Sequence, residues 1–481
     1  MKSVWTEGYE FRKRESLDKD MEIDVLVIGA GIAGILTAYM LKKKGVDVAI
    51  IEAKEIASGN TKNTTAKITS QHNLIYHKLI KEFGEEKAKE YALANELAIK
   101  KFQEIIKEEN IDCDFEKEDA YLYSLNDIDK LQKEFEAAKK LGIKAELVNN
   151  VEIPIEVKGA LKFSNQAQFN PIKFLKAISK DLTIYENTKA LKINEKENLV
   201  STKKGNIKAN SIIVATHFPI INVPGYYFMR MHQERSYVLA LENASNIKGM
   251  YIDIDKKGYS FRNYKNLLLF GGAAHRTGET EEGGSYDKLR KAVKNIYPDS
   301  KEKYYWSAQD CMTLDGIPYI GQYSLDTPNL YVATGFNKWG MTSSMISAMI
   351  LSDMILGNEN NFSDIFSPNR FDMSSSMKNA ADDVITTAKN FIAQKIHIPS
   401  ETLENIQNGH GGIVDYNGKK AGVYKDENGN VFTVSTKCPH LGCELKWNPE
   451  ELSWDCPCHG SRFDYRGTWI ESPAIKRLDN E

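Results

Sequence analysis

The chain has 481 residues, which is too long for one hydrophobic core, so we expect two or three domains. Its 42% hydrophobic and 27% charged content is ordinary for a soluble globular protein, and a net charge of −3 gives no electrostatic case for nucleic acid or an anionic membrane. No apolar run is long enough to span a bilayer and the start lacks the apolar core of a signal peptide, so we expect a cytoplasmic enzyme.

The first fifty residues divide into an arm and a βαβ unit. Residues 1–20 are polar and aromatic without a clear period, and we expect an N-terminal arm that lies on a neighbouring surface. An apolar run at 24–28 predicts a strand buried on both faces of a parallel sheet. An amphipathic helix ended by Gly45 follows, and a second strand at 48–51 ends in Glu52.

Three glycines with GxGxxG spacing, Gly29, Gly31 and Gly34, connect the first strand to the helix. The first permits a tight turn, the second lets the backbone approach a pyrophosphate, and the third lets the helix pack closely on the strand. The helix N-terminus favours the phosphate charge, and Glu52 stands where an acid accepts hydrogen bonds from an adenosine ribose. The unit predicts a dinucleotide site without separating flavin from nicotinamide cofactors.

Three later segments favour a flavin. The loop at 58–67 is polar and built of small residues, which suits a flavin's phosphates and ribityl chain, and residues 211–216 form a buried strand with a polar end. After residues 315–321, a strand at 330–334, a glycine loop and an apolar helix direct a positive helix end at the flavin edge that becomes anionic on reduction. The candidate cofactor residues here are Thr61, Thr64, Thr65, Ala215, Thr216, Gly335, Gly340, Met341 and Thr342.

These four segments, in this order, resemble the D-amino-acid oxidase, glycine oxidase and sarcosine oxidase family of FAD enzymes. The resemblance implies an α/β, Rossmann-like FAD domain of the D-amino-acid oxidase type within residues 21–366. It also implies an interleaved α+β substrate domain, roughly residues 76–160 and 225–305, over the reactive face of the flavin. In sarcosine oxidases a cysteine binds FAD covalently, but Cys311 lies too close to Asp315 for that spacing, so we do not expect covalent attachment.

Arg262, Tyr264 and His275 are the candidate catalytic residues, because they lie on or just after strands that face the flavin in that family. An arginine there could hold a substrate carboxylate with two hydrogen bonds. The alternatives are that Arg262 is a solvated strand residue and that His275 is a structural loop histidine.

The C-terminal part changes character. Residues 367–397 predict a helical linker that ends in a helix at 378–394, and residues 398–481 predict an all-β domain. Short strands there are separated by Asn417-Gly418 and by Asn428–Asn430, both of which are hairpin signals.

Two loops of this domain each combine a cysteine and a histidine: Cys438 with His440, and Cys456 with His459. Two cysteines and two histidines can hold a [2Fe-2S] cluster with one pair on each iron. The same ligands also satisfy zinc. Zinc is disfavoured because cysteine and histidine alternate within each loop and because a second cysteine pair, one in each loop, could form a bridge.

The segment resembles Rieske domains of the type found in cytochrome bc complexes. By that resemblance Cys438 and Cys456 bind one iron, and His440 and His459 bind the other. It also implies a disulfide between Cys443 and Cys458, which is unusual in a cytosolic protein. Phe463 stands where the family often has a tyrosine that donates to a ligand cysteine, so we predict a potential below the top of the range of about −150 to +300 mV.

Together the two resemblances predict an FAD-dependent dehydrogenase. It would oxidise an amine or amino acid and pass electrons through the cluster to an external acceptor, ferredoxin-like or quinone-type. Two alternatives remain open. The cluster could instead feed electrons into the flavin as part of a reductase, or it could be a redox sensor or docking module on a plain amine oxidase.

Overall fold

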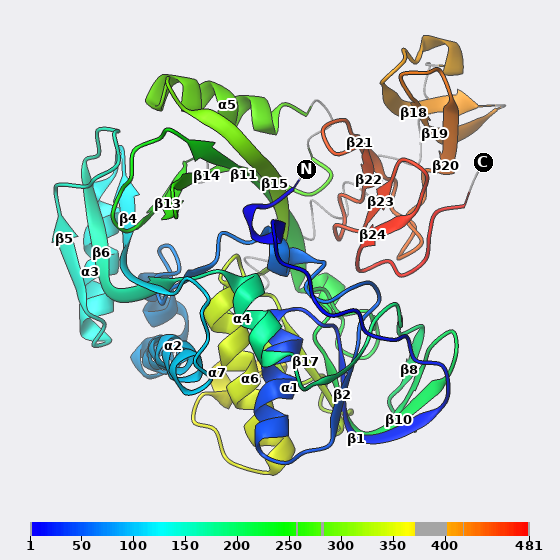
Figure 1. Ribbon diagram of the computed structural model, residues 1–481, viewed down its shortest axis with the longest axis horizontal. Coiled ribbons are helices and arrows are strands. Elements are labelled where there is room, and N and C mark those ends of the chain that lie inside the picture. The colour runs from blue at the N-terminus through cyan, green and yellow to red at the C-terminus, as the bar shows by residue number, and fades with distance from the viewer. Residues whose placement is uncertain (1, 256–257, 280–282, 371–401, 417, 480–481) are drawn as a thin grey trace.

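The computed structural model describes residues 2–255, 258–279, 283–370, 402–416 and 418–479 (Figure 1). The predicted linker helix at 378–394 lies outside the described residues. Within them, the chain forms two large sheets and two small ones. In Figure 1 the two small sheets lie beside β15 (Lys301–Thr313) and β11 (Met231–Glu242), on the side away from α2 (Tyr76–Glu108) and α3 (Ile128–Lys140).

The first large sheet has eight strands and contains the predicted βαβ unit. Its strands are β1 (Met21–Ile28), β2 (Val48–Ile51), β7 (Thr183–Tyr185), β8 (Lys192–Asn194), β9 (Leu199–Ser201), β10 (Asn206–Val214), β16 (Tyr319–Gln322) and β17 (Leu330–Thr334). The central order β17-β10-β1-β2-β7 is parallel throughout, which is why these strands are short apolar runs. Helices α1 (Ile32–Lys43) and α6 (Gly340–Leu356) follow β1 and β17, and α4 (Pro171–Ile178) begins with a proline in its first turn.

The second large sheet has nine strands in the order β15-β11-β14-β13-β12-β4-β6-β3, with β5 beside β6. The bounds are β3 (Lys67–Ile68), β4 (Glu116–Ser124), β5 (Ala145–Val148), β6 (Gly159–Gln168), β12 (Met250–Asp253), β13 (Ser260–Tyr264) and β14 (Leu267–Arg276), with α5 (Ser285–Ile296) packed on β14 and β11. Groups of its strands alternate along the chain with groups of strands of the first sheet.

The C-terminal domain consists of the two small antiparallel sheets. One contains β18 (Gly411–Tyr416), β19 (Lys419–Lys425) and β20 (Val431–Ser435), and the other contains β21 (Lys446–Asn448), β22 (Ser453–Asp455), β23 (Arg462–Asp464) and β24 (Trp469–Glu471). Trp447 and Trp454 pair across β21 and β22 with ring centroids 4.8 Å apart, and both belong to the core of this domain. The remaining helical pieces are α7 (Ser363–Phe366) and short 3-10 turns at Val4–Thr6, Asn60–Asn63, Tyr227–Met229, Pro368–Arg370 and Leu403–Asn405.

The N-terminal segment is anchored by Trp5, which is completely buried. Its indole nitrogen donates to the Thr64 carbonyl (2.7 Å), and its ring meets the edge of Tyr264 at 4.6 Å between centroids. The segment therefore holds the loop that contains Thr64.

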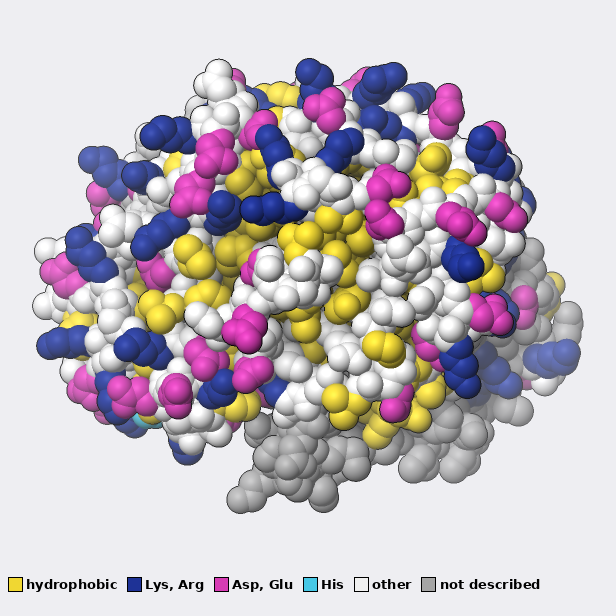
Figure 2. Space-filling view, turned by 90° about the horizontal axis from the view of Figure 1, so that it is seen from below, with side chains coloured by type: hydrophobic (Ala, Val, Ile, Leu, Met, Phe, Trp, Pro, Cys, Tyr) yellow, Lys and Arg dark blue, Asp and Glu magenta, His cyan; other side chains and the backbone are white. Residues whose placement is uncertain are grey.

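The surface carries mixed charge. On the face in Figure 2, lysine and arginine side chains are interspersed with aspartate and glutamate, as the small net charge leads one to expect. Among the described residues, no helix has the length and apolar character needed to cross a membrane.

Close backbone packing at the glycine turn generates a first prediction. A Cβ added at Gly34 would lie 2.0 Å from the Gly29 carbonyl oxygen, whereas the nearest atom to a Cβ at Gly412, on β18, would be Ile406 Cδ1 at 3.6 Å. Gly34→Ala should cost about 1–3 kcal/mol of stability and reduce FAD content, because α1 must move away from β1. Thermal unfolding and flavin absorbance measure both, with Gly412→Ala as the control. A Gly34→Ala protein that matches wild type in both would contradict the expectation.

Candidate functional site

A cavity of about 1940 Å³ lies where the two large sheets meet. The predicted cofactor residues that line it are Gly29, Gly31, Glu52, Thr61, Thr64, Thr65, Ala215, Thr216, Gly340 and Met341. They come from the ends of β1, β2 and β10, from the loop after β2, and from the start of α6. The topology therefore brings together segments more than 300 residues apart, as a dinucleotide site in a doubly wound sheet requires.

The N-terminus of α1 is built to receive an anion. Gly31 is its N-cap and has no capping side chain, so the first backbone N–H groups of the helix stay open toward the cavity, apart from that of Ile32, which donates to Thr61 Oγ1 (3.1 Å). Unpaired N–H groups and the helix dipole together favour a phosphate. These residues fit the pyrophosphate of FAD.

Glu52 is fixed at the end of β2. Its two carboxylate oxygens accept from the backbone N–H groups of Ala30 (2.8 Å) and Lys54 (2.9 Å). Burial raises the pKa of Glu52, and these two donors partly offset that rise. The carboxylate still lines the cavity, so its remaining lone pairs can accept from a ribose.

Three of the predicted cofactor residues lie behind the lining. Gly34 packs α1 on β1, and a Cβ at Gly335 would lie 2.3 Å from Thr313 Cγ2. Thr342 Oγ1 donates to the Thr69 carbonyl (3.2 Å) and lies 3.1 Å from His72 Nε2. These residues support the wall of the cavity, and they are not in contact with its interior. The sequence analysis missed His72, whose ring stacks on Trp339.

Arg262 and Tyr264 require a correction, because neither lines the cavity. The guanidinium of Arg262 is only 1% exposed and donates to the carbonyls of Thr65 and Ala66. Burial lowers its pKa to about 9. Tyr264 donates to Asp114 Oδ2 (2.8 Å) and accepts from Asn170 Nδ2 (2.8 Å). Both side chains are therefore engaged in holding the protein together. The position of these residues on a strand indicated which face of β13 they lie on, but it did not show that their polar groups are already bonded to other parts of the protein.

His275 does line the cavity, at the end of β14. Its Nδ1–H donates a hydrogen bond to the Arg276 carbonyl (2.8 Å), so its Nε2 accepts one from the Tyr237 hydroxyl (2.9 Å). Burial lowers the pKa of His275. A neutral histidine with both nitrogens engaged fits the structural alternative better than a base.

The sequence analysis missed a polar group on the sheet side of the cavity. His232 and Glu234 on β11, Asp310 on β15 and Lys338 before α6 all line it. Glu234 and Asp310 stand directly opposite each other in the strand register. A run of polar residues at every second position of β11, in a strand with an apolar second half, is the signal that could have pointed to this group.

The cluster loops hold the four predicted ligands close together. Cys438 and Cys456 are free, buried thiols close enough for one to donate to the other. The imidazole rings of His440 and His459 are perpendicular, with centroids 4.9 Å apart. His440 Nδ1 is buried without a hydrogen-bond partner, while its Nε2 lies 2.7 Å from Asn222 Oδ1. A [2Fe-2S] centre of this type needs two thiolates and two imidazole nitrogens, and the two thiols with the rings of His440 and His459 supply that set, so it fits the cluster.

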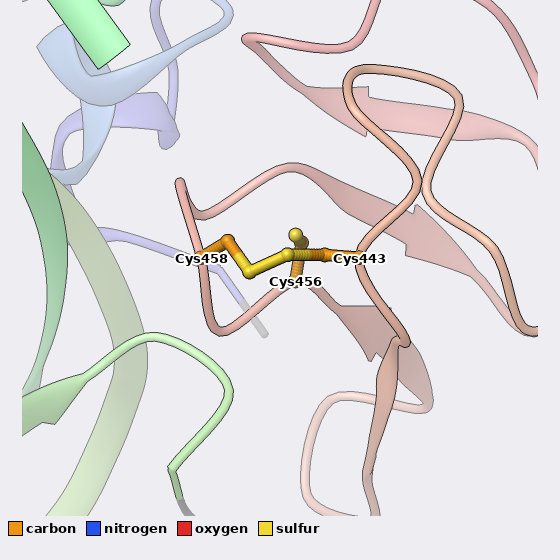
Figure 3. Close-up of side chains that lie close together, drawn as sticks. All are labelled: Cys443, Cys456 and Cys458. Carbon is orange, nitrogen blue, oxygen red and sulfur yellow. A yellow bond between two sulfur atoms is a disulfide. The ribbon is translucent and has the colours of Figure 1, made fainter. Parts of the chain in front are cut away.

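Cys443 and Cys458 form a disulfide between the two loops (Figure 3). Their Cα atoms are 6.5 Å apart, and the Cys456 sulfur lies within 4.8 Å of both of their sulfurs. Because a disulfide offers no thiolate, Cys456 is the one metal-binding candidate of these three. The bridge therefore braces the loop that presents Cys456.

Two further residues bear on the properties of the cluster. Ser461 is fully buried and its oxygen accepts from the Ala474 N–H (2.9 Å), which leaves its own proton free to donate toward the cluster site. Phe463 is buried opposite Trp454 and has no hydroxyl group. Tyr465 does not take its place, because its ring packs on Tyr424 and Phe432. The predicted lowered potential remains a prediction.

The cluster loop containing His459 docks on β11 and β15. Gln233 Nε2 donates to the His459 carbonyl (2.7 Å), and Gln309 Nε2 donates to the Gly460 carbonyl (2.8 Å). Neither glutamine lines the cavity, but the residues that follow them, Glu234 and Asp310, do. The ligand loop and the cavity therefore touch neighbouring residues of the same two strands.

A buried ionic network fixes this contact. Glu451 of the C-terminal domain accepts from Arg235 of β11 and from Arg462 of β23 (2.7 Å), and all three side chains are at most 5% exposed. Burial alone would raise the pKa of Glu451, but the two guanidinium groups outweigh it and hold that pKa at about 2. An ionised carboxylate at the interface thus links the two domains.

Strand β24 makes a second contact near Glu52. Lys54 Nζ donates to the Ile470 carbonyl (2.8 Å) and Lys189 Nζ donates to the Ile475 carbonyl (2.6 Å). Both ammonium groups lie over the Trp469 ring, at 4.7 and 3.6 Å from its centroid. Trp469 lines the same cavity as Glu52, so the C-terminal domain supplies part of the cavity wall.

Residues 24–354 match the family described as FAD dependent oxidoreductase, and residues 398–480 match the Rieske [2Fe-2S] domain. The chain belongs to the FAD dependent oxidoreductase family. Its FAD-binding domain is joined to a Rieske domain, so the protein is an oxidoreductase that binds FAD and a [2Fe-2S] cluster. Both resemblances inferred from the sequence are confirmed.

The relatives of this FAD dependent oxidoreductase include a protein that it matches over nearly its whole length. This chain is 41% identical to a Bacillus subtilis (strain 168) protein named as a Rieske 2Fe-2S iron-sulfur protein, YhfW, over 99% of this chain and 96% of that one. It is 23% identical to gamma-glutamylputrescine oxidoreductase of Escherichia coli (strain K12) over 72% of this chain and 87% of the relative. Glycine oxidase of Geobacillus kaustophilus has the same fold, with a TM-score of 0.60 and 18% identity over 73% of this chain and 99% of that one.

The cluster geometry predicts the outcome of removing single ligands. Cys438→Ser or Cys456→Ser should abolish the cluster while FAD stays bound, because each removes a thiolate that no other described cysteine can replace. Iron content, visible absorbance and electron paramagnetic resonance of the reduced protein measure this. Cys113→Ser, at a buried free cysteine far from these loops in sequence, is the control. Wild-type iron content in Cys456→Ser would overturn this ligand assignment.

The ionic network predicts how strongly the domains are docked. Glu451→Gln leaves two buried guanidinium groups without their shared carboxylate and should cost about 3–5 kcal/mol of docking free energy. Because the pKa of Glu451 is lowered from 4.5 to about 2, its contribution is complete above pH 4.5 and is lost as the pH falls through about 2.

Small-angle scattering and the thermal midpoint for cluster release test this contact. Glu451→Gln should increase the maximum dimension of the protein and lower the midpoint. Glu242→Gln, at the exposed Lys303 pair, is the matched control and should change neither. Equal effects of the two variants would count against a docking role for Glu451.

Proposed function

We propose that this protein is a dehydrogenase that oxidises an amine or amino acid at FAD and passes the electrons through the Rieske cluster to an external carrier, ferredoxin-like or quinone-type. The observation that carries the proposal is the docking of the His459 loop on Gln233 and Gln309, next to residues that line the cavity. We propose Cys438, His440, Cys456 and His459 as the cluster ligands. A cytoplasmic location is part of the same proposal, on the grounds of composition.

The chemistry divides between the cofactors and the chain. When bound, FAD supplies a two-electron oxidation and the cluster a one-electron transfer. The residues of the cavity bind and orient the cofactor, the disulfide braces the Cys456 loop, and Asn222 orients the His440 ring through Nε2. Gln233 and Gln309 hold the ligand loop against the cavity wall at a fixed distance.

The substrate class follows from the relatives. One relative is named for gamma-glutamylputrescine and one structural neighbour for glycine, and both names denote compounds with an amino group. The cavity is compatible with such substrates because its sheet side carries the carboxylates of Glu234 and Asp310. A reversed flow into the flavin, or a plain oxidase with a regulatory cluster, remains the alternative to be separated by experiment.

Anaerobic mixing tests the direction of electron flow. Glycine and gamma-glutamylputrescine are the first probes. A productive substrate should bleach the flavin first and then generate the signal of the reduced cluster. Stopped-flow absorbance monitors the first phase, and freeze-quenched electron paramagnetic resonance monitors the second. A cluster that stays oxidised while reduced flavin persists would refute the proposed route. Reduction of the protein by a low-potential ferredoxin without amine oxidation would favour the reductase instead.

Gln309→Leu provides a matched variant for the second phase. It keeps the volume of the side chain but removes the donor to the Gly460 carbonyl, so the flavin phase should stay within twofold of wild type while the cluster phase slows. Gln322→Leu, whose amide donates only within residues 324–325, is the control.

A further inference from the structure

Asp310 is a carboxylate that faces the cavity without a partner. It lies on β15 directly opposite Glu234 of β11, and both line the cavity. Directly opposed residues of an antiparallel pair have Cβ atoms about 4.5–5.5 Å apart, so the two acids share one local environment. Like charges at this separation repel each other, so the pair favours either a nearby cation or protonation of one of the two acids.

The cation that the protein supplies is used by Glu234. Lys338 Nζ lies 2.7 Å from Glu234 Oε2, and His232 Nε2 lies 3.4 Å from Glu234 Oε1. Across the described parts of the chain, no hydrogen bond or ion pair reaches the Asp310 carboxylate. The pKa of Asp310 is raised to about 6, mainly by burial; Lys338 and Arg235 oppose the rise, and Glu234 and Glu471 add to it. A positively charged ligand that bonded to Asp310 would balance the negative charge of its carboxylate.

The surroundings of Asp310 select the kind of cation. Trp306, Ala308 and Met312 line the cavity at alternate positions of the same strand, so the carboxylate stands in an otherwise apolar row. A metal ion is disfavoured because, in the described residues, only a cysteine set brings three metal-ligating atoms within 4.8 Å of one another. An organic ammonium ion with an apolar body would pair its charge with the Asp310 carboxylate and place its apolar part against Trp306, Ala308 and Met312.

Its position places such a ligand next to the cofactor. Lys338 belongs to the loop between β17 and α6, two residues before Gly340, which lines the cofactor cavity. Because Lys338 pairs with Glu234, the acid pair stands beside this loop. We infer that Asp310 receives the ammonium group of the substrate and selects a cationic amine over a free carboxylate. This inference rests on the proposed amine oxidation and names its recognition residue.

Binding to the oxidised holoenzyme tests the inference without turnover. The probes are n-butylamine, which is protonated at pH 8, and its anionic and neutral counterparts butyrate and butanol. Each is titrated at pH 8 into full-length protein that holds FAD and cluster, and the shift of the flavin absorption bands gives Kd. Wild type should bind n-butylamine at least tenfold more tightly than butyrate or butanol.

Three variants separate charge from structure. Asp310→Asn should weaken n-butylamine at least tenfold and change butanol by less than twofold, while Asp310→Glu should keep the preference for the cation. Glu242→Gln, at the exposed Lys303 pair and outside the cavity lining, is the control and should match wild type. FAD content and cluster absorbance verify that each variant is intact.

Several results would overturn the inference. One is that wild type does not bind n-butylamine at concentrations up to 100-fold above the butanol Kd. The others are that wild type binds butyrate more tightly than n-butylamine, or that Asp310→Asn binds n-butylamine as tightly as wild type does. If Asp310→Asn fails to hold FAD, the preference of wild type among the three probes decides. Amine binding that depends on Asp310 without flavin reduction by any amine would refute the proposed oxidation but keep the recognition. Equal rates of flavin reduction by an amine in Asp310→Asn and wild type would refute recognition by Asp310 but keep the proposed oxidation.

Discussion

The carboxylate of Glu451 is the contact on which the two-domain arrangement depends. It is buried between Arg235 and Arg462, one from each domain. Arg462 also pairs with Asp455 (2.9 Å), whereas the other carboxylate near Arg235, that of Glu471, lies 3.6 Å away. Separating the domains would remove Glu451, the close carboxylate partner of Arg235. The interface is therefore specific in geometry rather than a general apolar contact, and the glutamine contacts to the ligand loop follow from the position that it sets.

The docking has a direct bearing on how electrons can travel. Strands β11 and β15 carry Gln233 and Gln309 toward the Rieske loop and Glu234 and Asp310 toward the cavity. A strand alternates its side chains between faces, so one residue step separates the two environments. The same two strands thus form part of the cavity wall and contact the Rieske domain, and a shift of either strand would affect both.

The parts of the structure that the sequence predicts are those written in contiguous residues. The glycine turn, Glu52 and the two cysteine–histidine loops each carry their chemistry within a few positions, so the fold class and both cofactors could be inferred. Arg262 could not be judged in this way, because the carbonyls that occupy it belong to Thr65 and Ala66, nearly 200 residues earlier. The pairing of Asp310 with Glu234 depends on strand register, and the partner of Arg235 lies in another domain. Such contacts arise from tertiary packing and leave no local pattern.

Trp469 gives the cofactor cavity an unusual boundary. Its ring, held under the ammonium groups of Lys54 and Lys189, belongs to the Rieske domain but stands in the wall next to Glu52. A dinucleotide in this cavity is therefore enclosed by two modules of the same polypeptide, and removing the C-terminal module would leave one wall of its site open to water.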